Sequence, residues 1–214
     1  MHSFSENSFI AESKTRTASI QPKMTIYFAT NNLHKLEEIR AILSNRWQIG
    51  SLVELNCTEE LPETRQTLEC NSLQKAAHLF DRYKVDCFAD DTGLEVAALD
   101  GAPGVYSARY AGLKADNEAN IDLLLKNMVE KVDRTAQFRT VITLIYQGKT
   151  SQFTGIVKGT IAHERVGIKG FGYDAIFIPE GANRSFAEML PGEKNKISHR
   201  ARAVEELVAH LHRL

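Results

Sequence analysis

Apolar positions alternate between strand-like runs and helical spacing along the first half of the chain. The run MTIYFAT, residues 24–30, is rich in β-branched and aromatic residues and predicts a strand. It leads into Thr30, Asn31 and Asn32, residue types that favour turns and helix N-caps. Apolar residues then recur every three or four positions from Leu36 onward. This spacing predicts a helix directly after the polar turn.

The same periodicities predict the remaining elements. A second strand is expected within residues 47–55, a helix from Thr67, a strand at 85–89, an apolar run at 94–99 and an amphipathic helix over 117–132. Residues 136–162 predict a β-hairpin with its turn at 147–149, followed by a strand at 174–179 and a last helix over about 197–212. Helices that alternate with strands, followed by a hairpin, indicate an α/β fold with a mixed sheet.

The pattern divides the chain into an N-terminal extension and one domain. Residues 24–214 contain no repeat and no linker, so we expect a single domain with a sizeable core. Residues 1–23 are rich in Ser and Thr and lack apolar periodicity, so we expect a disordered extension or sequence upstream of a start at Met24. Lys14 and Arg16 leave a transit peptide as the alternative, and the two glutamates of this segment argue against it.

Composition and charge exclude several classes of partner. The formal net charge is −1, so no overall positive field attracts a nucleic-acid polymer or an anionic membrane surface. No apolar run is long enough to span a bilayer. The three cysteines form no CxxC pair, so neither a disulfide framework nor a cysteine zinc site is indicated, and a cytoplasmic setting is expected. Any anion site must therefore be a local cluster of basic residues.

Two adjacent acids, Asp90 and Asp91, follow the predicted strand at 85–89. Neighbouring side chains of a strand point to opposite faces. One site can therefore use both acids only where the strand ends, and we expect a break at Thr92-Gly93. Carboxylates at such a point suit Mg²⁺ or general-base catalysis on a water molecule. The alternative is a polar turn in which one aspartate caps the backbone.

Two lysines and one glutamate are further candidates. Lys35 lies on the first turn of a predicted helix, and the N-terminus of a helix favours bound phosphate. Lys75 lies on the helix that begins near Thr67, and Glu63 precedes that helix as a candidate metal-site acid. For each of these side chains the alternative is an ordinary solvated surface residue.

Two later segments add charge and an aromatic surface. GEKNKISHRAR, residues 192–202, gathers Lys194, His199 and Arg200 at the start of the predicted last helix, where cations are unfavourable unless an anion is near. GIKGFGYDAIF carries Phe171 among glycines, which offers a flat face for a nucleobase. The alternatives are a solvated basic face and an aromatic turn that closes the core.

These clusters together indicate a nucleoside-triphosphate site. Acids would hold a metal, cations would hold phosphates, and an aromatic loop would hold the base. The chain contains no GxxxxGK[ST], GxGxxG or HExxH motif. A Walker-type NTPase, a dinucleotide oxidoreductase and a zincin are therefore unsupported.

Five segments now make the chain recognisable. FATNNLHK, PETRQTLECNSLQKA, FADDTGLEVAALDGAPGVYSARYAG, GFGYDAIFIP and EKNKISHRA occur in this order, and the chain resembles the Ham1/inosine triphosphatase family over about residues 24–214. The resemblance implies a long mixed β-sheet flanked by helices, in two lobes around a central cleft, and a homodimer. It also implies Mg²⁺-dependent hydrolysis of ITP, dITP and XTP to the monophosphate and pyrophosphate, which clears deaminated purines from the nucleotide pool.

The resemblance assigns roles residue by residue. Glu63 and Asp91 match metal-site acids, and Asp91 also matches the proton acceptor for the attacking water, with Asp90 and Lys35 counted in the same catalytic set. The implied substrate contacts are Thr30, Asn31, Asn32, Lys35, Lys75, Thr92, Phe171, Gly172, Tyr173, Asp174, Lys194, His199 and Arg200.

Three positions depart from the family pattern. Arg65 stands where Gly is frequent, Cys70 where Glu or Gly is frequent, and Ser72 where Ala is usual. If an acid at position 70 helps to hold the metal, it is open whether the neighbouring Glu69 replaces it. The preference among ITP, dITP and XTP also stays open.

Two rival functions remain. One is a triphosphate pyrophosphatase that acts on modified pyrimidines, which would share the acidic and basic clusters. The other is a nucleotide-binding sensor without turnover. The intact set of Glu63, Asp90, Asp91 and Lys35 argues against the sensor, because a pure binder does not need a water-activating acid.

Overall fold

The helices and strands follow closely on one another in the computed structural model, which describes residues 24–43, 47–114 and 116–213. In chain order they are β1 (Met24–Phe28), α1 (Leu33–Ile42), β2 (Trp47–Gly50), α2 (Leu68–Tyr83), β3 (Cys87–Val96), β4 (Pro103–Gly104), α3 (Asn117–Asn127), β5 (Thr135–Tyr146), β6 (Lys149–Ile161), β7 (Phe177–Pro179), α4 (Pro191–Ile197) and α5 (His199–Leu211). Short 3₁₀ helices include η1 (Val53–Leu55), η2 (Ala97–Leu99), η3 (Ser107–Arg109) and η4 (Gly172–Ile176). The hypotheses about residues 1–23 lie outside the described residues.

One mixed sheet runs through the molecule, with strands in the order β2-β1-β3-β5-β6-β7 and the short β4 beside β3. β1 pairs in parallel with both β2 and β3, whereas the pairs β3-β5, β5-β6 and β6-β7 are antiparallel. β5 and β6 pair from Thr135 opposite Thr160 to Tyr146 opposite Lys149, as the predicted hairpin requires. The predicted α/β class with a mixed sheet is therefore confirmed.

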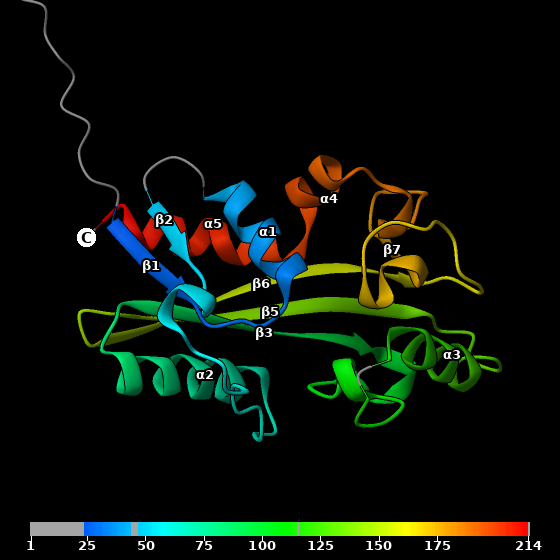
Figure 1. Cartoon of the computed structure of the whole chain (residues 1–214). Helices are drawn as coiled ribbons and strands as arrows, with labels where there is room; N and C mark the ends of the chain where they lie inside the picture. The colour runs from blue at the N-terminus through cyan, green and yellow to red at the C-terminus, as the bar shows by residue number, and fades with distance from the viewer. Residues whose placement is uncertain (1–23, 44–46, 115, 214) are drawn as a thin grey trace, which may run out of the picture.

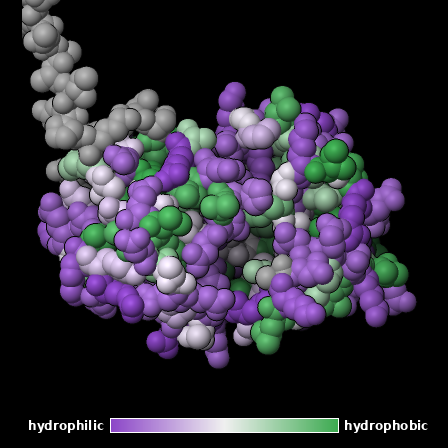
Figure 2. All heavy atoms as spheres, in the orientation of Figure 1, coloured by the Kyte–Doolittle hydropathy of each residue, from purple (hydrophilic) through white to green (hydrophobic). Residues whose placement is uncertain are grey.

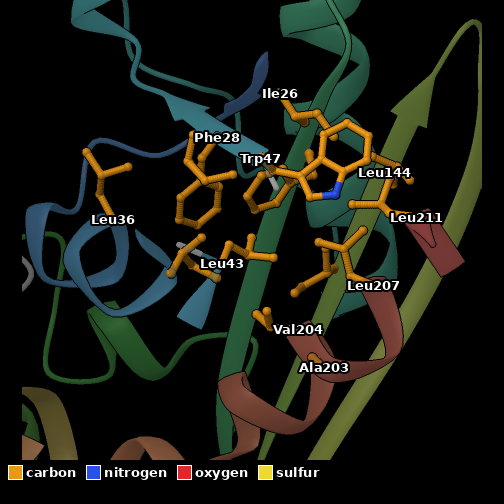
Figure 3. Packing of buried hydrophobic residues seen from close by; sticks show 14 residues of the cluster. Ile26, Phe28, Leu36, Leu43, Trp47, Leu144, Ala203, Val204, Leu207 and Leu211 are labelled. Carbon is orange, nitrogen blue, oxygen red and sulfur yellow. The ribbon is translucent and has the colours of Figure 1, made fainter. Parts of the chain in front are cut away.

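Helices cover both faces of the sheet at its β1 end (Figure 1). α1 and α5 lie on one face and α2 lies on the other. The core under α1 and α5 contains Phe28 and Phe88, whose rings stack 4.6 Å apart, together with Trp47 and Leu207 (Figure 3). A smaller core under α2 contains Leu79. Each large apolar side chain that is fully buried in this way contributes about 1.5–3 kcal/mol to stability.

The far end of the sheet has a core of its own. There Leu94, Ile121, Phe138, Phe177 and Phe186 pack together, from β3, α3, β5, β7 and the 3₁₀ helix η5 (Phe186–Glu188). The long strands β3 and β5 run through both ends of the molecule (Figure 1). Two lobes therefore share one continuous sheet, and their separation leaves room for a cleft.

The expectation that a strand ends at Asp90 and Asp91 is wrong. β3 continues to Val96, and both aspartates pair with β5, opposite Ile142 and Val141. Gly93 is not a break, because its missing side chain makes room for β4: a Cβ there would lie 2.6 Å from the Gly104 carbonyl oxygen. It is the neighbouring strand β1 that ends, at Phe28.

Several predicted boundaries also change. The expected strand at 47–55 ends at Gly50 and gives way to η1, and the run at 94–99 is the end of β3 followed by η2. The helix over 117–132 ends at Asn127. The first half of the expected strand at 174–179 belongs to the 3₁₀ helix η4, and the second half is β7. The last helix begins at His199 and is preceded by a separate helix, α4, which the pattern did not predict. Among the described residues, none of the helices has the length and apolarity needed to cross a bilayer.

Gly155 on β6 sets how closely α5 can approach the sheet. A Cβ at this position would fall onto the His199 carbonyl oxygen and the Ala203 amide nitrogen of α5. We therefore expect Gly155→Ala to destabilise the protein by about 1–3 kcal/mol, as overpacking does, when measured by urea denaturation. Gly192→Ala is the matched control, because a Cβ at Gly192 meets open space. Equal midpoints for the two variants would contradict this role of Gly155.

Candidate active site

A cavity of about 770 Å³ opens where β3 lacks a neighbouring strand. β1 pairs with β3 only as far as Phe88, and β4 resumes the pairing on the same edge at Leu94. Residues 89–93 therefore have a free strand edge, and Asp91 and Thr92 line the cavity there. Figure 2 shows this face of the molecule hollowed between the two lobes.

The turn after β1 forms one wall of the cavity. The Thr30 hydroxyl accepts a hydrogen bond from the Asn32 amide at 3.1 Å, and the Asn32 side chain caps α1 by accepting from the Lys35 amide at 3.2 Å. These local bonds end the strand, begin the helix and place Lys35 at the cavity. Thr30, Asn31, Asn32 and Lys35 all line it, so the structure brings this predicted group together.

Asp90 lies beneath the site rather than in its lining. Its carboxylate is buried and accepts from Lys35 Nζ at 2.9 Å and from Arg200 Nε at 3.3 Å. Burial opposes its ionisation, but Lys35 and Arg200 outweigh this effect and hold the pKa of Asp90 well below its usual range. Asp90 therefore stays ionised and fixes two cations that come from helices at opposite ends of the chain.

Asp91 points to the other face of β3, toward α2. Its carboxylate accepts from Asn71 Nδ2 at 3.0 Å and lies 3.9 Å from Lys75 Nζ. Burial raises the pKa of Asp91, and Lys75 and Lys35 offset this only in part. An ionised carboxylate with a raised pKa is a better proton acceptor than an ordinary aspartate.

Lys75 joins the two acids that were predicted to hold a metal. Its ammonium group contacts the Glu63 carboxylate directly, and it is buried rather than exposed on the surface. Burial opposes the charge of each partner, but their attraction wins, so the pKa of Lys75 is raised and that of Glu63 is lowered. A cationic group thus already occupies the space between Glu63 and Asp91.

The opposite end of the cavity is built around Phe171 and Lys194. Lys194 Nζ contacts Asp174 Oδ2 at 2.7 Å and Glu38 Oε1 at 3.1 Å, and it lies 4.8 Å from the centre of the Phe171 ring. Asp174 also accepts from the Phe171 amide at 2.9 Å, which fixes the loop that carries the ring. Gly172, Tyr173 and Asp174 line the cavity beside Phe171, so the structure brings this group of candidate residues together.

His199 and Arg200 complete this end. Burial and then the charges of Arg200 and Lys194 hold the pKa of His199 well below its usual value, so its ring is neutral at physiological pH. The ring stacks on Phe138 at 4.6 Å, and its buried Nδ1 has no hydrogen-bond partner among the described residues. Arg200 is fully buried and contacts Glu38 as well as Asp90.

The electrostatic conflict expected at 192–202 is resolved by the protein itself. Lys194 lies in the last turn of α4, where a cation is favourable, and Ser198 separates the two helices and caps α5. Arg200 does lie at a helix N-terminus, but Glu38 and Asp90 neutralise it. The basic cluster therefore does not depend on a bound anion for its charge balance.

Sequence reasoning missed Glu38 and Asn71 and left the role of Cys70 open. Glu38 on α1 contacts Lys194 and Arg200, and Asn71 on α2 contacts Asp91. Neither Cys70 nor Glu69 lines the cavity. Cys70 is exposed, and Glu69 pairs with Arg139. The spacing of Glu38 three residues after Lys35 on one helix was the available signal.

The fold and the cavity define an α/β protein with a charged cleft between two lobes, and sequence comparison gives its family. A sequence profile of the Ham1 family matches residues 26–210. A dITP/XTP pyrophosphatase of Christiangramia forsetii is 50% identical over 188 residues, which cover 88% of this chain and 99% of that protein. A dITP/XTP pyrophosphatase of Porphyromonas gingivalis is 54% identical over 183 residues, which cover 85% of this chain and 94% of that protein.

Comparison with a solved structure agrees with this family assignment. A HAM1 protein from Coxiella burnetii superposes with a TM-score of 0.83 at 36% identity, over 89% of this chain and 100% of that one. The chain belongs to the Ham1 family, and the resemblance inferred from its five segments is confirmed.

We expect Asp90→Ala to lower the free energy of unfolding by about 3–5 kcal/mol, because removing one member of a buried ion pair leaves uncompensated charge. Urea denaturation measures the difference. Asp81→Ala, at an exposed site, is the control and should change the midpoint little.

The pKa shift of Asp90 also predicts how this difference depends on pH. The pKa of Asp90 is lowered in the folded state, so its stabilisation is fully present above its unfolded pKa of about 3.9 and is lost as pH falls through the lower, folded value. The difference between wild type and Asp90→Ala should therefore shrink below about pH 4. A difference that grows in acid would contradict the account.

Proposed function

We propose that this protein hydrolyses deaminated purine nucleoside triphosphates (dITP, ITP and XTP) to the monophosphate and pyrophosphate, with Mg²⁺. Relatives named as dITP/XTP pyrophosphatases match this chain over nearly their whole length. This similarity supports the activity of a nucleoside-triphosphate pyrophosphatase. The observation that carries the chemistry is Asp91: an acid with a raised pKa that lines a cavity with cations at one end and an aromatic ring at the other.

The acids at the cavity suit Mg²⁺. Glu63 and Asp91 offer hard carboxylate oxygens on either side of Lys75, whose charge marks a position where a cation is stable. Mg²⁺ is usually held by one or two carboxylates together with water and substrate phosphates, so two acids are enough. When bound, the ion would neutralise phosphate charge and lower the pKa of a water molecule.

Asp91 is the proposed proton acceptor. Asn71 and the Thr92 amide, which donate to it at 3.0 Å each, hold its carboxylate in one orientation. The raised pKa lets it take a proton from a water molecule that attacks the α-phosphorus. The positive charge of Lys75 favours the ionised form of Asp91 over the protonated form. Asp91 therefore releases the proton to solvent after the reaction.

Lysines at the cavity stabilise the charge that develops during the reaction. Lys35 and Lys75 come from the first turn of α1 and from α2, and both line the cavity near Asp91. The Lys35 ammonium group is already fixed by the buried Asp90, so it need not reorganise when charge moves onto the departing pyrophosphate. Asp90 is thus a positioning residue in this mechanism, because it does not line the cavity.

The base is read at the other end of the cavity. Phe171 offers a face for stacking, typically about 1–3 kcal/mol per base. A 6-oxo purine presents an acceptor oxygen, which suits the donors of Arg200 and the Nδ1 of neutral His199 in the tautomer that carries its proton there. Adenine presents an amino group instead and would leave a buried donor unpaired, at a cost of about 1–3 kcal/mol.

Product analysis tests the proposal. Incubation with dITP, ITP and XTP should give monophosphate and pyrophosphate, turnover should require Mg²⁺, and ATP should react at least about tenfold more slowly. Asp91→Asn should reduce kcat by about 10²–10⁴-fold, because a positioned base is lost. The exposed Asp81→Asn variant is the control for a lost carboxylate.

Three outcomes would count against the proposal. Release of single phosphates would place the cleavage elsewhere on the triphosphate. Turnover confined to modified pyrimidine nucleotides would shift the base preference. Binding of nucleotide by the folded protein without any turnover would favour a sensor.

A further inference from the structure

Five cationic side chains line the cavity, and one of them differs from the rest. They are Lys35, Lys75, Arg109, Lys194 and Arg200. Lys35 and Lys194 each have a carboxylate oxygen within 2.9 Å, and Lys75 and Arg200 contact Glu63 and Glu38 closely. In the described part of the chain, the carboxylate nearest to Arg109 is that of Glu63, at 3.9 Å.

The guanidinium of Arg109 therefore keeps spare donors. Nη2 makes a long contact of 3.4 Å with the Glu63 carbonyl oxygen, and the group lies 5.3 Å from the centre of the Tyr106 ring. Neither contact neutralises its charge. An arginine has five N–H donors in a planar fork, which matches the oxygens of a phosphate in pairs.

The fold holds Arg109 in place through its backbone rather than through an ion pair. Arg109 ends η3, whose first residue, Ser107, accepts from the Leu94 amide at 2.9 Å and donates to the Gly104 carbonyl at 2.6 Å. Tyr173 donates to the Ser107 carbonyl at 2.9 Å, and Asn120 donates to the Ala108 carbonyl at 3.1 Å. Four hydrogen bonds that involve side chains, with partners on β3, β4, η4 and α3, thus fix the segment that carries Arg109.

The position of Arg109 indicates which part of a substrate it meets. Its head group lies beside Glu63, at the metal-binding end, whereas Phe171 and Arg200 form the base-binding end. If the base lies against Phe171 and the α-phosphate lies at Asp91, the part of a triphosphate that extends further, toward Glu63, is the pyrophosphate. A side chain at this end therefore meets the leaving group and not the monophosphate.

We propose that Arg109 binds the departing pyrophosphate through its guanidinium. The inference rests on the proposed function, since it assumes cleavage between the α- and β-phosphates. The other four cations are paired closely with acids of the protein, which offset much of their charge. Arg109 adds positive charge that stabilises the pyrophosphate. The long contact of Arg109 with Glu63 leaves guanidinium donors available to a substrate.

The test is binding of magnesium pyrophosphate and of inosine monophosphate by calorimetry, at saturating Mg²⁺. Arg109→Gln should weaken pyrophosphate binding about 10–100-fold, as expected for lost charge-assisted hydrogen bonds, and leave monophosphate binding within about twofold. Arg109→Lys keeps the charge but loses the fork, so its pyrophosphate affinity should lie between those of wild type and Arg109→Gln. Arg165→Gln, a surface arginine paired with Glu118 and Asp122, is the control and should change neither affinity.

A role limited to holding Glu63 makes a different prediction. Arg109→Gln would then raise the Mg²⁺ concentration needed for half-maximal activity and leave pyrophosphate affinity at saturating Mg²⁺ unchanged, which would overturn the proposal. Equal weakening of pyrophosphate and monophosphate binding would overturn it too. If the wild type binds pyrophosphate but turns over none of the purine triphosphates, the proposed function fails while the binding assignment is still tested.

Discussion

Strand β3 continues past the end of its parallel neighbour β1, and the candidate site occupies the edge that is left open. Residues 89–93 keep their pairing with β5, so the strand stays rigid while its other edge faces the cavity. The alternation of side chains along β3 then sends Asp90 toward α1 and α5 and Asp91 toward α2. The two adjacent acids therefore have different surroundings: Asp90 holds two cations, and Asp91 is the acid that we propose for catalysis.

Charge pairing explains how so many buried ionic groups are tolerated. Asp90, Glu38, Asp174 and Glu63 each contact at least one lysine or arginine of the cavity, and these contacts connect α1, α2, β3, η4, α4 and α5. Such pairs are weak sources of net stability, but breaking one is costly. Their effect is to hold the cations in place before a substrate arrives. Among the cations that the described residues bring to the cavity, Arg109 has the longest carboxylate contact, 3.9 Å to Glu63.

Local sequence patterns were enough to predict the helices and strands that have a strong periodicity. The hairpin of β5 and β6 and the helix α2 follow from alternation and helical spacing, and the five segments led to the family and hence to most of the lining residues. The sequence could not show that β3 continues past Thr92 while its neighbour β1 stops at Phe28, because the open edge depends on strand pairing and not on the residues of β3. Glu38 was missed because its partners Lys194 and Arg200 lie 156 and 162 positions away. The split between α4 and α5 depends on Ser198, a residue that fits equally well inside a helix pattern and at a cap.

In the proposed reaction, Asp91 directs a water molecule to the α-phosphorus of a purine triphosphate. Hydrolysis of dITP in ¹⁸O-labelled water, followed by mass spectrometry of both products, shows which phosphorus the water attacks. We expect one labelled oxygen in the monophosphate and none in the pyrophosphate. Label in the pyrophosphate would mean that water attacks the β-phosphorus, and the assignment of Asp91 to the α-phosphate would then be contradicted.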